Sequence, residues 1–293
     1  MNESPKTGNR ASTVLARRLG RELHRLRDAA GKTQHEAGAS INSTNSKIVK
    51  MERGLVPMRD PDLRVLCEFY EADAKDTGRL LELARLDRER RKAKGWWQHS
   101  PQAGALAEYI AMEDVARRVR TWQLSLIPGL FQTSDYARSL AVSDGVWEDP
   151  NDIERIVDVR MKRQERLTGD NPLEVYAVVW EAALRQQVGG PQVMRRQLER
   201  LLEVSQLPNV RLQVMPFHAG GHPCVSSTFN IISFAENEAV DVVHTDTIVS
   251  TVWVENEEEG AVYSTFFDRT ARLSLAPKDS VSLIDSICKG MYT

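Results

Sequence analysis

Three polar residues near position 48 have the chemistry and spacing to bind nucleic acid. Asn45, Ser46 and Lys50 fall on one side of an expected helix whose other side carries Ile48 and Met51, three residues apart. An asparagine amide can pair with an adenine edge, and a lysine ammonium can reach a phosphate or a base. The pattern is typical of a helix that presents its N-terminal half to the major groove of DNA.

The residues before this helix predict a shorter helix and a tight turn. Thr33 and Glu36 have the spacing of a capping box at a helix start, and Thr44 can cap the next helix. Gly38 is small enough for the two helices to cross closely, and Asn42 stands where the turn needs a residue that tolerates left-handed backbone. Two ordinary surface helices would also fit, but the agreement of caps, small residue and apolar positions favours the DNA-binding interpretation.

This segment resembles the helix-turn-helix of the XRE-type, repressor/Cro-like family, roughly across residues 14–72. The resemblance is carried by Thr33-Gln34, by the run from Thr44 to Ile48, and by Glu52-Arg53-Gly54. The chain departs from the family at two positions, with Asn42 in place of the usual glycine and Gly38 in place of the usual alanine. The glycine should cost about 1 kcal/mol of helix stability.

The resemblance implies roles for individual residues. Asn45 and Ser46 would contact bases, Gln34 would bond a phosphate, and Lys50 would reach bases or backbone. The full set of expected DNA-binding residues is Thr33, Gln34, Thr44, Asn45, Ser46, Lys47, Lys50 and Arg53.

Charge is divided unevenly along the chain. Residues 1–95 carry 21 Lys and Arg against 14 Asp and Glu, which is +7, whereas the remainder carries 18 against 27, which is −9. Such a division is typical of a DNA-binding module joined to an acidic regulatory body, although charge runs can also be solvated surface.

Length and composition indicate the general class of protein. A chain of 293 residues suggests two domains. Three scattered cysteines are too few for a disulfide scaffold, and the chain has neither a signal-peptide core nor a stretch of the roughly 20 apolar residues that span a membrane. We therefore expect a cytoplasmic, nucleoid-associated protein without membrane contact.

The chain divides into four expected regions. Residues 1–12 are polar and expected to be disordered, residues 13–75 form the helix-turn-helix domain, residues 76–102 form a linker helix and connector, and residues 103–293 form a C-terminal domain. The linker helix could pack on the first domain, join the two domains, or pair with a second subunit. Its basic run, Arg88 to Lys92, could approach DNA or be a solvated face.

The C-terminal domain is expected to be mixed, which makes the whole chain α+β: an all-α N-terminal domain joined to a domain with a small, mostly antiparallel sheet. The pattern between Leu106 and Arg120 fits helix or strand equally well. An acidic turn is expected at Glu257 to Gly260. The expected strands are Leu173–Trp180, Val210–Met215, Phe229–Phe234, Asp241–His244, Ile248–Val254 and Val262–Phe267, the last two as a hairpin.

The C-terminal domain carries a resemblance of its own. The runs Trp122 to Thr133, Trp180 to Arg185 and Pro208 to Val210 are similar to a large domain of uncharacterised function. Actinobacterial XRE-type regulators of the antitoxin-like kind carry this domain, with a Gly-Trp-Trp at the position of Gly95 to Trp97. The resemblance implies a transcriptional regulator, often encoded beside a short protein that it binds.

Aromatic residues and a proline in and just after the first of these runs could form a binding surface. Trp122, Pro128, Phe131 and Tyr136 could line an apolar pocket or a groove for a partner. Aromatic residues at this spacing are also typical of a core, so both interpretations stay open.

We find no pattern that indicates an enzyme, a metal site or a cofactor. His218, His222 and Cys224 are spaced as metal ligands can be, but Gly220, Gly221 and Pro223 exclude the regular helix that would bring two histidines to one face. No nucleophile elbow, phosphate loop or dinucleotide fingerprint is present. The expectation is therefore no catalytic residue, no metal ligand and no cofactor.

Two function classes remain. In the first, the protein is a sequence-specific DNA-binding regulator, a homodimer on double-stranded DNA whose C-terminal domain mediates dimerisation and binds a small partner protein or effector. In the second, it is an antitoxin-like protein that mainly neutralises a short partner encoded by a neighbouring gene, and DNA binding serves autoregulation.

Overall fold

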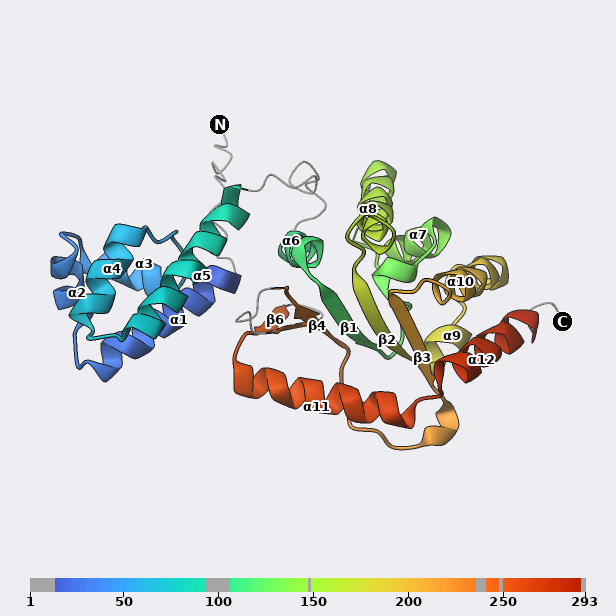
Figure 1. Cartoon of the computed structure of the whole chain (residues 1–293). Coiled ribbons are helices and arrows are strands. Elements are labelled where there is room, and N and C mark those ends of the chain that lie inside the picture. Colours follow the sequence, from blue (N-terminus) through green and yellow to red (C-terminus); the bar gives the residue numbers. More distant parts are fainter. Residues whose placement is uncertain (1–13, 93–105, 147–148, 236–240, 248–249, 291–293) are drawn as a thin grey trace. The chain divides into compact units, whose positions relative to one another are not determined.

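The computed structural model describes residues 14–92, 106–146, 149–235, 241–247 and 250–290 (Figure 1). It divides into two compact units, residues 1–95 and residues 96–293. The expected disordered N-terminus, the connector after Lys92 and the Gly95 to Trp97 motif lie outside the described residues.

The described part of the first unit is helical. Leu15, Leu19, Leu23 and Leu26 form the expected apolar stripe of the first helix, and all four are buried. Asn42 adopts the left-handed backbone that its turn requires, with φ of 49°. The helices are α1 (Val14–Ala29), α2 (Gln34–Ser40), α3 (Asn45–Glu52), α4 (Asp60–Phe69) and α5 (Ala74–Lys92).

Two features join these helices tightly. At Gly20 in α1, a Cβ atom would lie 2.3 Å from the carbonyl oxygen of Glu52, so α1 and α3 approach as closely as only glycine allows. The helix expected as a linker, α5, packs against α1 and α4 and belongs to the first unit. Arg88 in α5 bonds the carbonyl oxygen of Met58 at 2.8 Å and pairs with Asp60 at 2.7 Å. The first residue of the basic run is therefore engaged within this unit.

The second unit is built on a six-stranded mixed sheet with the order β3-β2-β1-β4-β5-β6. Strand β1 pairs in parallel with β2, and β2 in parallel with β3. The pairs β1–β4, β4–β5 and β5–β6 are antiparallel. The strands are β1 (Arg118–Gln123), β2 (Glu174–Trp180), β3 (Val210–Met215), β4 (Phe229–Ser233), β5 (Val242–Asp246) and β6 (Thr251–Val254).

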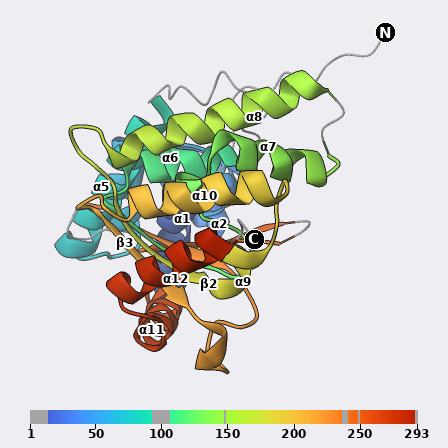
Figure 2. The same ribbon diagram turned by 90° about the vertical axis from the view of Figure 1, so that its right-hand side faces the viewer.

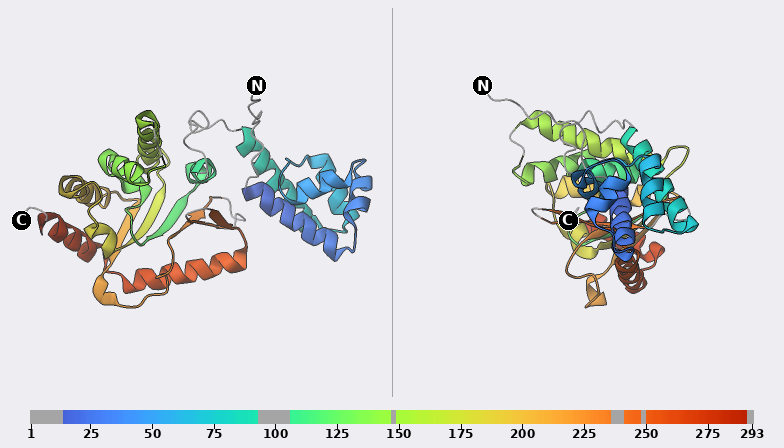
Figure 3. Two further views of the ribbon diagram at one scale, coloured as in Figure 1. Left: turned by 180° about the vertical axis from the view of Figure 1, so that it is seen from behind. Right: turned by 90° about the vertical axis from the view of Figure 1, so that its left-hand side faces the viewer.

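Helices cover both faces of this sheet (Figures 1 and 2). One face carries α6 (Ala107–Val115), α7 (Ser134–Ser143), α8 (Pro150–Arg163) and α10 (Pro191–Val204), and the opposite face carries α11 (Glu257–Leu273). The view from behind shows the same two layers (Figure 3). Helix α12 (Pro277–Gly290) packs against α10 and β3, and α9 (Glu181–Arg185) follows β2. Short 3-10 turns are η3 (Gly129–Phe131), η4 (Gln164–Leu167) and η5 (Phe217–Ala219).

The structure confirms the α+β class and corrects the order of its elements. The ambiguous region after Leu106 forms both α6 and β1, and β1 lies inside the sheet between β2 and β4. The expected strand Val262–Phe267 is wrong, because these residues lie inside α11. The expected acidic turn is the first turn of the same helix, which Asn256 caps by accepting hydrogen bonds from the backbone of Glu258 and Glu259.

Candidate functional site

The turn between α2 and α3 is built as the sequence predicts. The hydroxyl of Thr33 accepts a hydrogen bond from the Glu36 backbone at 3.2 Å, and the Glu36 carboxylate accepts one from the Thr33 backbone at 2.8 Å. The Thr33 backbone and hydroxyl both donate hydrogen bonds to the Glu36 carboxylate, and these bonds lower the pKa of Glu36. Thr44 caps α3 by accepting a hydrogen bond from the Lys47 backbone at 3.3 Å. Both threonine side chains therefore position the helices.

Helix α3 has a buried side and a polar exposed side. Ile48 and Met51 are fully buried in the core of the first unit. Asn45, Ser46 and Lys50 are exposed, so the three residues expected to read DNA lie on the surface of α3, with Asn45 and Ser46 in its first turn and Lys50 in its last turn. The arrangement offers an amide, a hydroxyl and an ammonium to one ligand, and these groups can donate to base edges and phosphates.

Two other expected DNA contacts are engaged inside the unit. The Gln34 side chain donates a hydrogen bond to Glu52 at 2.7 Å, and the Lys47 ammonium pairs with Asp62 of α4 at 2.7 Å. Gln34 and Lys47 therefore join α2, α3 and α4 in this structure. Arg53, the last of the expected contacts, is the C-cap of α3 and is exposed.

A buried ion pair ties the three helices beneath this surface. The Arg27 guanidinium of α1 donates to both carboxylate oxygens of Glu52, at 2.6 and 3.3 Å, and to the carbonyl oxygen of Lys32 at 2.8 Å. The hydrogen bond to Glu52 raises the pKa of Arg27. A second contact joins Arg27 to His24 Nδ1 at 2.6 Å. Glu52 thus receives hydrogen bonds from α1 and from Gln34 at the start of α2, and so determines how α3 sits against both helices.

In the second unit, the four residues proposed for a groove separate into two environments. Trp122, Phe131 and Tyr136 have exposed fractions of 0%, so they belong to the core. The Tyr136 hydroxyl accepts a hydrogen bond from the backbone of Ile127, next to Pro128. Pro128 lines the pocket between α6, α8 and the strands, which the other three do not line.

Buried amide side chains hold the chain around Pro128 in place. Gln132 donates to the carbonyl oxygen of Ile127 at 2.8 Å, and Gln164 donates to that of Gln132 at 2.6 Å. Gln197 donates to the carbonyl oxygen of Phe131 at 2.8 Å and accepts from the Thr133 backbone at 2.7 Å. The run that carried the resemblance therefore builds a fixed wall of the pocket.

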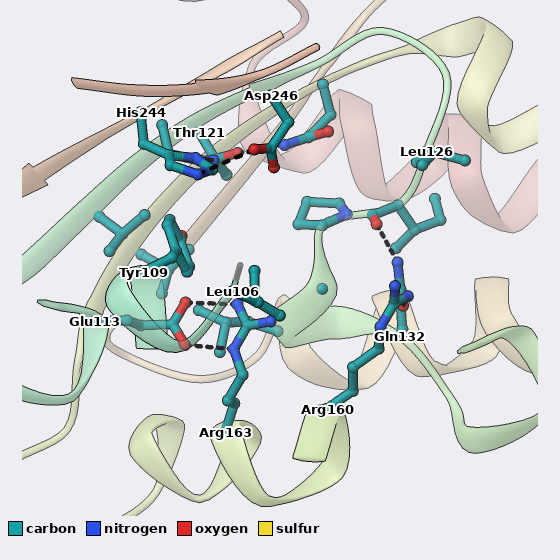
Figure 4. A pocket seen from close by; sticks show the side chains of 18 residues that line it. Leu106, Tyr109, Glu113, Thr121, Leu126, Gln132, Arg160, Arg163, His244 and Asp246 are labelled. Atoms are coloured by element: carbon teal, nitrogen blue, oxygen red, sulfur yellow. Dashed lines mark hydrogen bonds and ion pairs between the residues drawn. The ribbon is translucent and has the colours of Figure 1, made fainter. Parts of the chain in front are cut away.

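The pocket has a volume of about 170 Å³ and lies between α6, α8, the strands and this wall (Figure 4). Its floor contains a buried, two-pronged ion pair between Arg163 of α8 and Glu113 of α6, with distances of 2.7 and 2.9 Å. The Arg163 guanidinium also lies 5.2 Å from the centre of the Tyr109 ring. His244, packed on Tyr109, lies 3.3 Å from Asp246 at the rim.

The residues once considered as metal ligands have separate roles. His218 is exposed, whereas His222 is buried against Trp122, and burial lowers the pKa of His222. The Cys224 sulfur accepts a hydrogen bond from the Thr270 hydroxyl at 3.2 Å, and burial raises the pKa of this thiol. Within the described ranges, no three His, Cys, Asp or Glu side chains gather as a metal site.

Sequence reasoning missed the buried ion pairs that hold each unit's candidate site in place. Arg27, Glu113 and Arg163 are buried, and the side chain of Glu52 is only 6% exposed. A charged residue on the apolar side of a helix is a signal of such a pair. Its partner lies 25 to 50 positions away in the chain, so the pairing becomes visible only in the fold.

Comparison with known proteins identifies both units. The family described as a domain of unknown function (DUF5753) matches residues 106–286, and a helix-turn-helix domain matches residues 18–80. No curated protein and no solved structure matches the chain. In the part of the chain that the structure describes, no helix has the length and apolar character to cross a membrane.

Proposed function

The chain belongs to the DUF5753 family, and we propose that it is a sequence-specific transcriptional regulator of the XRE type, with an antitoxin-like relationship to a short partner protein. Its helix-turn-helix domain indicates a DNA-binding regulator. The observation that carries the proposal is the exposed polar side of α3, where Asn45, Ser46 and Lys50 lie over a fully buried apolar side.

In this proposal each exposed residue of α3 has its own role in DNA recognition. Asn45 reads a base edge, since its amide can pair with adenine, and Ser46 adds a hydrogen bond to a base or a phosphate. Lys50 attracts the backbone or reaches a base. Gln34 and Lys47 act by fixing α3 through Glu52 and Asp62, and each contacts a phosphate only if it leaves that carboxylate.

Helix α11 supports the proposed homodimer. Val262, Phe266 and Leu273 lie on its outer side with exposed fractions of 52%, 38% and 49%. Together with Arg269 they recur at intervals of four, three and four residues, which is the spacing of a seam between two packed helices. An apolar stripe of this length is the kind of surface that another helix covers.

The charges of α11 favour a second copy of the same helix as the occupant. Its first turn contains Glu257, Glu258 and Glu259, and its last turns contain Arg269 and Arg272. Two antiparallel copies would place each acidic end beside the basic end of the other, with Phe266 near the two-fold axis. We therefore propose an α11–α11 dimer that carries two DNA-binding units to half-sites about one helical turn apart.

Titration of DNA binding tests the proposed regulator. Full-length protein is titrated into a labelled duplex of its own upstream region and into a shuffled duplex of equal composition, at several salt concentrations. We expect the upstream duplex to bind more tightly, and the affinity for both to fall steeply with salt because phosphate contacts release counterions. Equal affinity for both duplexes at every salt concentration would reject sequence-specific regulation.

Exposed apolar residues after β3 support the proposed binding of a short partner protein. Phe217 and Val225 are exposed by 49% and 65%, and the Phe217 ring lies edge-on to Trp180. Coexpression of the full chain with each short neighbouring gene product tests this role. A stable complex that Phe217→Ser weakens would support the role, and copurification of no neighbour would reject it.

A further inference from the structure

The pocket of the second unit holds a guanidinium that forms no ion pair with any described carboxylate. Arg160 and Arg163 lie three residues apart on α8 and both line the pocket. Arg163 is neutralised by Glu113, but Arg160 donates to the uncharged amide oxygen of Gln132 at 2.7 Å. Among the residues that the structure describes, Arg160 forms no ion pair. The pocket therefore presents one positive charge that is not paired directly with a carboxylate.

The surroundings of Arg160 strengthen its attraction for an anion. The side chain is half-buried, and burial together with the nearby Arg163 lowers the pKa of Arg160 against an opposing effect of Asp144, which does not line the pocket. A guanidinium stays charged at neutral pH all the same. A positive charge with reduced access to water gains more from an anionic partner than an exposed one does. Gln132 is itself fixed by Ile127, so the guanidinium is held in one orientation.

The remaining walls of the pocket limit the kind of anion. Leu106, Leu126, Ile127, Pro128 and Leu130 supply an apolar surface. On the side away from Arg160, Figure 4 shows Asp246 beside His244. The hydrogen bond from His244 lowers the pKa of Asp246, so this carboxylate is anionic at neutral pH and repels a second negative charge.

We propose that this pocket is a binding site for a small monoanionic organic acid, whose carboxylate pairs with Arg160 and whose apolar body lies against the wall around Pro128. The volume of about 170 Å³ fits a body the size of a benzene ring, since an apolar cavity of about 150 Å³ binds benzene. The site makes the second unit a sensor domain. Binding to the pocket does not require the proposed DNA recognition, so the two proposals fail separately.

Calorimetric titration of the full chain tests the site with three probes of matched shape. Benzoate carries one charge, benzamide carries none, and terephthalate carries two. We expect benzoate to bind about tenfold or more tightly than benzamide, because the amide lacks the negative charge and the second acceptor oxygen that the carboxylate offers to the guanidinium. We expect terephthalate to bind more weakly than benzoate because Asp246 repels its second carboxylate. Benzoate binding that is absent or equal to benzamide binding would overturn the proposal.

Variants assign the binding to the named residues. Arg160→Gln should weaken benzoate about tenfold or more, while Arg160→Lys should retain part of the affinity. The matched control is Arg155→Gln, because Arg155 is an exposed arginine of the same helix that pairs with Asp152 and does not line the pocket. Asp246→Asn should raise the affinity for terephthalate relative to benzoate. Unchanged benzoate affinity in folded Arg160→Gln and Arg160→Lys proteins would place the ligand elsewhere and reject the site.

Discussion

Asn45 and Lys50 lie on the same exposed side of α3 but carry different chemistry, so their substitution separates base reading from phosphate attraction. Asn45→Ala should reduce discrimination at one base pair by about 1–3 kcal/mol, because the amide that pairs with adenine is lost. Lys50→Ala should weaken all duplexes more evenly and reduce the salt dependence, unless Lys50 also reads a base. Anisotropy titrations against single-base variants of the operator measure both effects. Equal loss on every duplex from Asn45→Ala would remove Asn45 from base reading.

Glu52 is the residue on which the orientation of α3 depends. Glu52→Ala leaves the Arg27 charge buried without its partner, and we expect the first unit to lose roughly 3 kcal/mol of stability. Glu52→Gln keeps an oxygen for Arg27 and should lose less. Hydrogen exchange of α1 and α3 peptides in the full chain measures the change in local unfolding free energy. Unchanged exchange in Glu52→Ala would show that the pair does not hold α3.

At the scale of single residues, local sequence patterns predicted the helix caps but not the side-chain partners that lie far apart in the chain. Thr33, Asn42 and Thr44 have the predicted conformations, because capping and left-handed turns depend on neighbours in the sequence. The roles of Gln34 and Lys47 as phosphate contacts stay predictions. Their bonds to Glu52 and Asp62 span 18 and 15 residues, and such pairs depend on how helices pack.

The crossing of α1 and α3 depends on a single small residue. At Gly20 an added Cβ would lie 2.3 Å from a backbone oxygen of Glu52, so Gly20→Ala must push the two helices apart. We expect a loss of about 1–3 kcal/mol in the stability of the first unit. Hydrogen exchange of the α1 and α3 peptides measures it.

Gly78 provides the matched control for this prediction. It also lies within a helix of the first unit, α5, but a Cβ there would meet no atom within 4 Å. Gly78→Ala should stabilise α5 by about 0.5–1 kcal/mol, because alanine loses less conformational freedom than glycine in a helix. Similar effects at Gly20 and Gly78 would contradict the close crossing.

Element types were predictable where periodicity was strong. The Leu stripe of α1 and the alternation of β2 and β3 predicted those elements correctly. Val262 to Phe267 is rich in residues that favour strands, yet it lies in α11, where Asn256 caps the helix and Phe267 packs into the sheet core. Tertiary packing thus overrides the local preference. The central strand β1 has only two apolar residues among six, and its neighbours β2 and β4 come from distant parts of the chain, so its local pattern did not identify it as a strand.

At the scale of the whole molecule, the proposal assigns DNA contact to the first unit and dimerisation to the second. The oligomeric state can therefore be tested separately from DNA binding. If α11 forms the dimer seam, Phe266→Ser should convert the dimer to a monomer, because it removes the aromatic side chain nearest the proposed two-fold axis. The control is Val142→Ser on α7, where an apolar side chain is exposed by 61% outside the proposed seam. Sedimentation velocity of the full-length proteins measures both.

Loss of the dimer should also change DNA binding. A monomer contacts one half-site, so the affinity of Phe266→Ser for a two-half-site operator should approach its affinity for a single half-site. A wild-type protein that sediments as a monomer at all concentrations, or a Phe266→Ser protein that stays dimeric, would reject the α11 seam. Neither result would argue against the proposed DNA contacts of α3.

Selection of bound sequences from a pool of random duplexes tests the central claim most directly. The full chain is incubated with the pool at moderate salt, and the bound duplexes are sequenced. We expect enrichment of one motif with two half-sites about one helical turn apart, and loss of one base preference in each half-site with Asn45→Ala. Recovery of duplexes without any common motif would show that the exposed side of α3 does not read sequence.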